Sequence, residues 1–211
     1  MIEDKIWSSN PSTYIIGSDE VGRGSFAGPI GAAAVRINFE HIDLLLDVKD
    51  SKKLSPKKRN QIFELVQESE IEYSYIERDN EFIDLYGIKL ANEKVLEDSI
   101  SSIFQDGDIV YVDHFKISKF NAISLIRGED NCRPIALASI IAKVLRDNFM
   151  IEISNKYSRY AFDKNKGYGT KEHRSAIKKY GLSDFHRKSK SPYFLIALSD
   201  FHRKSFNLMP K

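Results

Sequence analysis

Two adjacent carboxylates interrupt an otherwise apolar segment near the N-terminus, in the stretch IIGSDEVGRG at residues 15–24. Apolar runs at residues 13–19 and 28–37 flank a glycine-rich turn, a pattern that predicts a hairpin at the start of a β-sheet. Asp19 and Glu20 would lie at the rim of that sheet, where they repel each other and lose hydration. The sequence therefore predicts a group at this point that offsets the repulsion and the lost hydration of the two carboxylates.

The rest of the chain mixes strand-like and helix-like patterns. Strand-like runs occupy residues 71–76 and 108–113. Helical spacing, with Ser and Pro or Thr and Gly at the expected ends, occupies four further stretches: residues 55–66, 88–104, 134–149 and 170–181. This order predicts a mixed α/β fold that begins with a hairpin.

Composition sets the broad class of protein. The chain has 211 residues, of which 42% are hydrophobic, enough for the core of one large domain. Its one cysteine, Cys132, excludes an internal disulfide framework and a cysteine-based zinc cluster, and it suits a reducing compartment. The N-terminus lacks the pattern of a signal peptide, and no apolar run is long enough to span a bilayer. We expect a cytoplasmic protein that makes no use of a membrane.

Positive charge is concentrated in the C-terminal part. Residues 151–211 contain 14 Lys and Arg against 5 Asp and Glu, a net charge of +9, whereas the remainder has 18 against 25, a net charge of −7. A basic segment beside an acidic body is typical of a protein that binds both a polyanion and a cation, although solvated surface charge gives the same imbalance.

An eight-residue repeat, LSDFHRKS, occurs at residues 182–189 and again at 198–205, an offset of 16 residues. One repeat is too short for a solenoid, so we interpret it as a local tandem duplication. If the fold offers a single docking position, one copy occupies it and the other is exposed or disordered. Deleting residues 182–197 should then restore an ending with one copy.

A third acid, Asp113, ends the strand-like run DIVYVD, much as Asp19 and Glu20 end the first run. Strand ends commonly border the ligand crevice of α/β sheets. Carboxylate oxygens are hard ligands that suit Mg²⁺ or Mn²⁺, and a pair of such ions can support phosphodiester hydrolysis. A cap or a salt bridge would explain any one of these acids alone, but the adjacent pair favours a metal site.

The segment Gly22-Arg23-Gly24 resembles a dinucleotide-binding turn only in part. The next glycine, Gly28, comes one position late for the G-x-G-x-x-G pattern, and no helical pattern follows it. A pyrophosphate cradle at a helix N-terminus is therefore not expected. A glycine-flanked arginine instead lets the backbone approach a ligand closely while the cation contacts phosphate, unless the segment is a simple turn.

Four motifs, in this order, resemble the type 2 ribonuclease H family in its bacterial ribonuclease HII form. They are GSDEVGRGSFAGP at 17–29, DSKKLS at 50–55, ASIIAKVLRD at 138–147 and NKGYGTKEH at 165–173. The resemblance implies an α/β, ribonuclease H-like fold: a mixed β-sheet flanked by helices, with a small C-terminal helical portion. We accordingly expect a catalytic core at residues 1–157 and a basic C-terminal helical segment at residues 158–211 that contains the duplication.

The resemblance also implies an activity. Members of the family are metal-dependent endoribonucleases that use Mg²⁺ or Mn²⁺ to hydrolyse the RNA strand of RNA/DNA hybrids. They also cut at single ribonucleotides embedded in duplex DNA, leaving 3′-hydroxyl and 5′-phosphate ends. We expect a monomer that acts on such duplexes in DNA replication and repair. The alternative is a catalytically silent hybrid-binding protein with the same fold, and the identity of the fourth acid discriminates between the two.

Four acids serve the family as catalytic residues and metal ligands. Three of them match Asp19, Glu20 and Asp113. The fourth lies six residues before the apolar position that opens the long helix, and counting back from Ile135 selects Glu129. Residue type favours its neighbour Asp130 instead, because the family pattern has aspartate there, and Asp147 is a further alternative.

The same matching implies a set of substrate-binding residues: Gly22, Arg23 and Gly24 around the ribose 2′-hydroxyl, Tyr168 stacked on the sugar, and Lys52 and Lys53 at phosphates. The 2′-hydroxyl is the group that distinguishes RNA from DNA at a given site. The two lysines are equally typical of solvated surface. The chain departs from the family at His114, where glycine usually follows the third acid, and this residue would either crowd the metal site or add a ligand.

Overall fold

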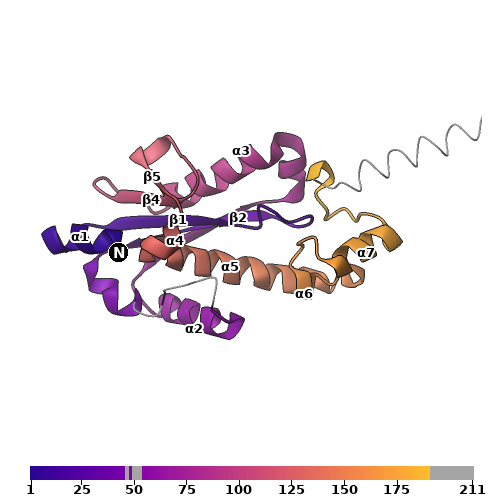
Figure 1. The fold of residues 1–211 in the computed structure, drawn as a ribbon, viewed down its shortest axis with the longest axis horizontal. Helices are drawn as coiled ribbons and strands as arrows, with labels where there is room; N and C mark the ends of the chain where they lie inside the picture. Colours follow the sequence, from indigo (N-terminus) through magenta and orange to yellow (C-terminus); the bar gives the residue numbers. More distant parts are fainter. Residues whose placement is uncertain (46–47, 49–53, 191–211) are drawn as a thin grey trace, which may run out of the picture.

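In the computed structural model, which describes residues 1–45, 48 and 54–190, a five-stranded mixed sheet lies between two layers of helices (Figure 1). The strand order is β3-β2-β1-β4-β5. The central strand β1 pairs antiparallel with β2 and parallel with β4. The strands are β1 (Ile15–Val21), β2 (Ile30–Ile37), β3 (Glu72–Arg78), β4 (Ile109–Asp113) and β5 (Ile123–Leu125).

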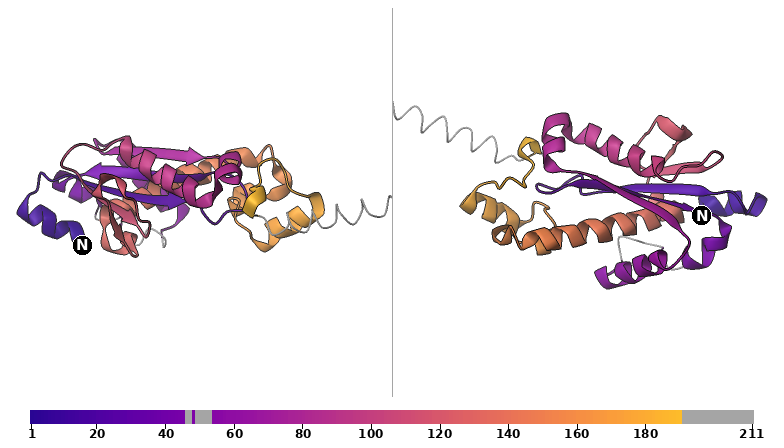
Figure 2. Two further views of the ribbon diagram at one scale, coloured as in Figure 1. Left: turned by 90° about the horizontal axis from the view of Figure 1, so that it is seen from above. Right: turned by 180° about the vertical axis from the view of Figure 1, so that it is seen from behind.

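Helices cover both faces of the sheet. Helices α2 and α5 lie over one face and α3 over the other, each closing a separate hydrophobic core (Figures 1 and 2). The α-helices are α1 (Ile2–Ser9), α2 (Pro56–Gln67), α3 (Asn80–Ser101), α4 (Gly128–Asn131), α5 (Arg133–Ser154), α6 (Phe162–Asn165) and α7 (Lys171–Tyr180). Short 3₁₀ segments are Phe39–Leu45, Lys119–Asn121, Ser158–Tyr160 and Lys188–Lys190. The expected α/β fold with a mixed sheet is confirmed.

Local capping sets the helix boundaries that the sequence predicts. The Ser55 hydroxyl accepts a hydrogen bond of 3.2 Å from the Lys58 N–H at the start of α2. The Thr170 hydroxyl does the same for the His173 N–H at the start of α7. Gly181, with φ of 78°, ends α7 in a conformation that residues other than glycine rarely adopt.

The first hairpin is present, but the prediction that its acids lie at the strand end is wrong. β1 continues through Val21, so that Asp19 pairs with Ala33 and Glu20 with Ala32 of β2. Strand pairing uses backbone groups, and polar side chains do not end it. The two acids therefore stand on a part of β1 that pairs with β2, just past Ser18, where the pairing with β4 ends.

Helix α3 also differs from the sequence pattern, and two short elements were not predicted. Helix α3 begins eight residues before the expected position 88, because the Asp79 side chain accepts a hydrogen bond of 2.7 Å from Phe82 N–H. Gly87, with φ of 82° and ψ of 155°, then kinks the helix and interrupts its apolar spacing. The short strand β5 and helix α1 have no counterpart in the sequence prediction.

Gly17 lets helix α5 pack directly on β1. A Cβ at this position would lie 2.2 Å from the carbonyl carbon of Pro134 and 2.3 Å from the backbone nitrogen of Ile135. Real Cβ atoms do not approach backbone that closely, so only glycine permits the contact. The first turns of α5 are thereby held over the strand that carries Asp19.

The C-terminal part packs through a small core of its own, in which Met150, Tyr160, Phe162 and Ile177 surround Ala27. The first copy of the duplicated octapeptide docks against this region and buries His186 and Arg187. The second copy, residues 198–205, lies outside the described residues. Within the described ranges, no helix combines the length and the apolar character that crossing a membrane would require.

Candidate active site

Asp19 and Glu20 lie side by side on β1 and differ in their surroundings. Asp19 is only 7% exposed, and one of its carboxylate oxygens accepts a hydrogen bond of 2.8 Å from the Glu20 N–H. Glu20 Oε1 lies 3.7 Å from a guanidinium nitrogen of Arg23. A cation therefore balances Glu20 in part, whereas Asp19 is held by hydrogen bonds in a buried position.

Asp113 comes to the same place because β4 runs parallel to β1. The register pairs Ser18 with Val112, so the next residue of each strand is an acid at the same level of the sheet. Asp113 Oδ1 accepts a short hydrogen bond of 2.6 Å from the Gly128 N–H. This bond fixes the start of α4 against the end of β4.

The two candidates for the fourth acid occupy neighbouring positions on α4 and face different surroundings. Glu129 is 5% exposed, and its charge contributes to the raised pKa of Asp19. Asp130 instead pairs with Arg127 at 2.7 Å and is partly exposed. The spacing argument for Glu129 and the geometry thus point to the same residue.

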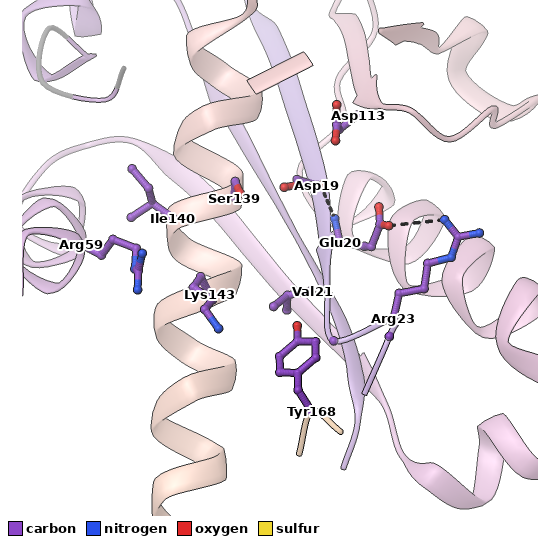
Figure 3. Close-up of a pocket in the computed structure, with 12 residues that line it drawn as sticks. Asp19, Glu20, Val21, Arg23, Arg59, Asp113, Ser139, Ile140, Lys143 and Tyr168 are labelled. Atoms are coloured by element: carbon purple, nitrogen blue, oxygen red, sulfur yellow. Dashed lines mark hydrogen bonds and ion pairs between the residues drawn. The ribbon is translucent and has the colours of Figure 1, made fainter. Parts of the chain in front are cut away.

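The three strand acids open into one pocket of about 390 Å³ that also contains cations (Figure 3). Arg23 comes from the loop after β1, Arg59 from α2 and Lys143 from α5. Tyr168 closes the pocket on the side away from Asp113. Carboxylates at one end and cations beside them suit a ligand that brings both metal ions and phosphates.

Two acids of this pocket, Asp19 and Glu20, have a raised pKa, and burial is the main cause for both. Burial, and after it the charge of Glu20, raises the pKa of Asp19 to about 8, and the Asp113 and Glu129 charges add to this. A hydrogen bond with Ser139 acts in the opposite direction. Burial also raises the pKa of Glu20, against the effect of Arg23. Perturbed carboxylates in a cleft are typical of a functional site.

The donor set fits a divalent cation. Among the described residues, no three His, Cys, Asp or Glu side chains stand together as a preformed ligand cluster. Glu20 is engaged by Arg23 and Asp113 by Gly128, so these side chains would have to turn to share an ion. Burial is the main cause of the raised pKa of Asp19, and a divalent cation would relieve the repulsion from the neighbouring acids that adds to it.

The glycine-rich loop, residues 22–29, carries Gly22, Arg23 and Gly24 to the mouth of the pocket. Gly22 has φ of 82°, and a Cβ there would lie 2.2 Å from Nε of Arg146. Gly24 has no heavy atom within 4 Å of the corresponding position, so its backbone is open to a ligand. The predicted substrate-binding glycines thus border the same pocket as the acids.

Three other residues predicted for the site are not found in the pocket lining. Lys52 and Lys53 fall outside the described residues. Asp147 forms an ion pair of 2.8 Å with Lys143 and lines a neighbouring cavity instead of the acidic pocket. As an alternative fourth acid, Asp147 therefore has less geometric support than Glu129.

Sequence reasoning missed several residues of the pocket. Ser139 and Lys143 lie four residues apart on α5, so both face β1, and Arg59 reaches the pocket from α2. The helical spacing of Ser139 and Lys143 within the ASIIAKVLRD motif was the available signal. Arg59 gave none, because its approach depends on how α2 packs against α5.

His114, the departure from the family pattern, is exposed and has φ of 50°. A non-glycine residue in this left-handed region is strained, which accounts for a preference for glycine at this position. We expect His114→Gly to increase the free energy of unfolding by about 0.5–1 kcal/mol, measured by urea denaturation. His114→Ala is the matched control: it removes the same imidazole but keeps the strain, so an equal gain from alanine would contradict the explanation.

Solved structures share this fold. The ribonuclease H2 from Pyrococcus horikoshii OT3 superposes with a TM-score of 0.71 over 84% of this chain and 93% of that one, at 22% identity. Bst-RNase HIII in complex with Mn²⁺ gives a TM-score of 0.62 over 86% of this chain and 67% of that one, also at 22% identity. The mixed sheet and its helices define an α/β protein of the ribonuclease H-like class.

Sequence comparison identifies the family within the ribonuclease H-like class. The Ribonuclease HII family profile matches residues 16–208. The chain is 43% identical over 190 residues to the Ribonuclease HII of Caldicellulosiruptor bescii. The aligned region covers 89% of this chain and 91% of the relative. This chain belongs to the ribonuclease HII family, as the motifs at residues 17–29 and 138–147 predict.

Proposed function

We propose that this protein is a metal-dependent endoribonuclease. It hydrolyses the RNA strand of RNA/DNA hybrids and cuts at single ribonucleotides embedded in duplex DNA, leaving 3′-hydroxyl and 5′-phosphate ends. The observation that carries the proposal is the pocket in which Asp19, Glu20 and Asp113 face Arg23 and Lys143. Membership of the ribonuclease HII family supports the same reaction.

Asp19, Glu20, Asp113 and Glu129 would hold Mg²⁺ or Mn²⁺. When bound, such ions activate water for attack on a phosphodiester and stabilise the leaving oxygen. Glu129 is not among the residues that line the pocket, and its charge acts on Asp19. The carboxylates thus supply both the ligands and the negative potential that attracts the cations.

The other pocket residues would hold and read the nucleic acid. Arg59 and Lys143 lie where they can contact backbone phosphates. The open backbone at Gly24, with Gly22 and Arg23, would approach the ribose 2′-hydroxyl. Lys52 and Lys53 remain proposed phosphate contacts. The exposed lysines and arginines at residues 158–181 would bind the duplex beyond the cut site.

The alternative function is a hybrid-binding protein without catalysis. The presence of a buried glutamate at position 129, near Asp19, favours the enzyme because it supplies the fourth acid. We also propose that the protein is a monomer that acts in DNA replication and repair. We place it in the cytoplasm, because a single buried thiol, Cys132, suits a reducing compartment. Light scattering of the purified protein tests the monomer directly.

One cleavage assay tests the function. The substrate is a DNA duplex with a single embedded ribonucleotide, incubated with Mg²⁺, Mn²⁺ or chelator, and the same duplex without the ribonucleotide is the control. Cleavage at the ribonucleotide only, and only with metal, is the expected result. Binding without cleavage under every condition would establish the silent alternative, and full activity in chelator would refute metal dependence.

Tyr168 should contribute by stacking on the sugar at the RNA-to-DNA step. Its ring lines the pocket, with the Lys143 ammonium 5.6 Å from the ring centroid. We expect Tyr168→Ala to reduce kcat/KM at a single ribonucleotide by the equivalent of about 1–3 kcal/mol. Tyr168→Phe is the matched control, because it keeps the ring and loses only the hydroxyl. A similar loss in both variants would assign the effect to the hydroxyl and contradict stacking.

A further inference from the structure

Two fully buried guanidinium groups hold the backbone of the glycine-rich loop. Arg146 of α5 donates to the Pro29 carbonyl at 2.9 Å and to the Ser25 hydroxyl at 3.0 Å. Arg187, from the first copy of the duplicated octapeptide, donates to the carbonyls of Gly28 at 2.8 Å and Pro29 at 2.7 Å. It also reaches the carbonyls of Arg23 and Ser25, each at 3.2 Å.

Neither guanidinium forms an ion pair within the described part of the chain. Both side chains are 0% exposed, and burial lowers the pKa of Arg146 and lowers that of Arg187 to about 9. Burying a cation against carbonyls alone is expensive, and an apolar side chain would fill the space at lower cost. The rigid fork of Arg187 does what an apolar side chain cannot, because it fixes several carbonyls of one loop at defined positions.

The same octapeptide reaches Tyr168 through two histidines. The Ser183 N–H donates to Nδ1 of His186 at 3.0 Å, and the Nε2 atoms of His186 and His173 are 3.0 Å apart. Nδ1 of His173 lies 2.9 Å from the Tyr168 carbonyl oxygen. One tautomer assignment satisfies the whole chain: His173 donates to Tyr168, and His186 donates to His173.

We propose that Arg187 and His186 are positioning residues, through which the segment at residues 182–187 holds the glycine-rich loop and Tyr168 in the relative places needed to read a ribose. Neither side chain is exposed or lines the acidic pocket, so neither contacts substrate. They act through groups that do line it, namely Gly22, Arg23, Gly24 and Tyr168. The inference rests on the proposed function of this pocket.

The test separates reading of the ribose from binding of the duplex. For Arg187→Met, kcat/KM is measured with Mg²⁺ on a duplex containing one ribonucleotide, and the same duplex without it is used as a competitive inhibitor. We expect kcat/KM to fall about tenfold, the effect of one hydrogen bond misplaced at the 2′-hydroxyl, while the inhibition constant stays within about twofold. Rates are divided by the folded fraction measured by circular dichroism, and a defect in the duplex-binding surface would change both quantities.

The duplication supplies a matched control. Arg203 has the same sequence neighbours in the second copy as Arg187 has in the first, so Arg203→Met alone should change neither quantity. The Arg187→Met and Arg203→Met double variant excludes replacement of the first copy by the second. An unchanged kcat/KM in the double variant, or a loss in Arg203→Met alone, would overturn the proposal.

Two further variants keep the test independent of folding. If Arg187→Met fails to fold, Arg187→Lys retains the charge and the stem but not the planar fork. His186→Gln replaces the imidazole that connects Ser183 to His173. Each variant should lower kcat/KM without changing the inhibition constant. If both variants cleave at the rate of the parent protein, the positioning role is contradicted. A parent protein that cleaves no ribonucleotide substrate would refute the proposed function itself, a result distinct from every outcome above.

Discussion

Asp19→Asn is expected to lower cleavage of a duplex with one embedded ribonucleotide by at least about a hundredfold, because the lost carboxylate is central to the proposed metal site. Duplex binding should stay within about twofold of the parent, since phosphate contacts from the basic residues are unchanged. The measurements are single-turnover cleavage with Mg²⁺ and fluorescence anisotropy of a labelled duplex. Asparagine has nearly the same size and keeps one oxygen acceptor, so the change isolates the charge.

The thermal stability of the protein provides a second test of the role of Asp19, and this test does not depend on activity. In the folded protein the pKa of Asp19 is about 8, against an ordinary value of 3.8. The folded state therefore holds this proton more tightly, and the stability it confers is complete below about pH 4 and is lost as pH rises toward 8. In chelator, Asp19→Asn should melt at a higher temperature than the parent at pH 9, with little difference near pH 4.

A divalent metal ion should raise the melting temperature of the parent more than that of Asp19→Asn. A divalent cation that binds only the folded state raises the melting temperature, and at neutral pH the rise should be larger for the parent than for Asp19→Asn. An equal rise in the two proteins would place the ion elsewhere. Unchanged cleavage by Asp19→Asn would remove this residue from the reaction altogether.

Glu129→Gln should lower cleavage on a similar scale, whereas Asp130→Asn should retain most activity. The buried Glu129 acts on Asp19 through its charge, while Asp130 pairs with Arg127 at the surface. Glutamate is one methylene longer than aspartate and offers the same two hard oxygens. The two variants are matched in chemistry and differ by one position, which makes their comparison under saturating Mg²⁺ decisive.

Each other outcome of this pair has a distinct meaning. Loss of cleavage only in Asp130→Asn would transfer the fourth acid to that residue and show that counting back from Ile135 gives the wrong register. Full activity in both variants would indicate a site of three acids. Melting temperatures of both variants, measured in chelator, should accompany the rates, because Glu129 is buried and its replacement also changes packing.

The sequence predicted most of the sheet and the strand acids because both depend on local patterns. Apolar runs predicted β1, β2 and β4, an alternating run predicted β3, and acids at the ends of two of these runs indicated the site. The pattern could not show that β1 continues past Asp19 to Val21, since that depends on hydrogen bonds from β2. It also missed β5, whose three residues are mostly exposed and carry little apolar signal.

Residues that act across long distances in the chain left no local signal. Arg59 approaches the pocket only because α2 packs beside α5. Arg187 resembled an ordinary residue of a basic tail, and only the fold shows it bonded to carbonyls at positions 23–29. Charge counts predicted a polyanion-binding surface there, but they could not separate an exposed cation from a buried one.

The parallel pairing of β1 with β4 has a consequence for the order of folding. β1 can pair with β2 as soon as the hairpin forms, but its other edge must wait for a strand far along the chain, with Ile15 opposite Ile109. Contacts of such sequence separation form late, because the intervening loop must first be closed. We therefore expect the contact between Asp19 and Asp113 to form late in folding. Above about pH 8, where Asp19 is ionised, repulsion between the two acids should speed unfolding more than it slows nucleation, so that neutralising it would mainly lengthen the lifetime of the native state.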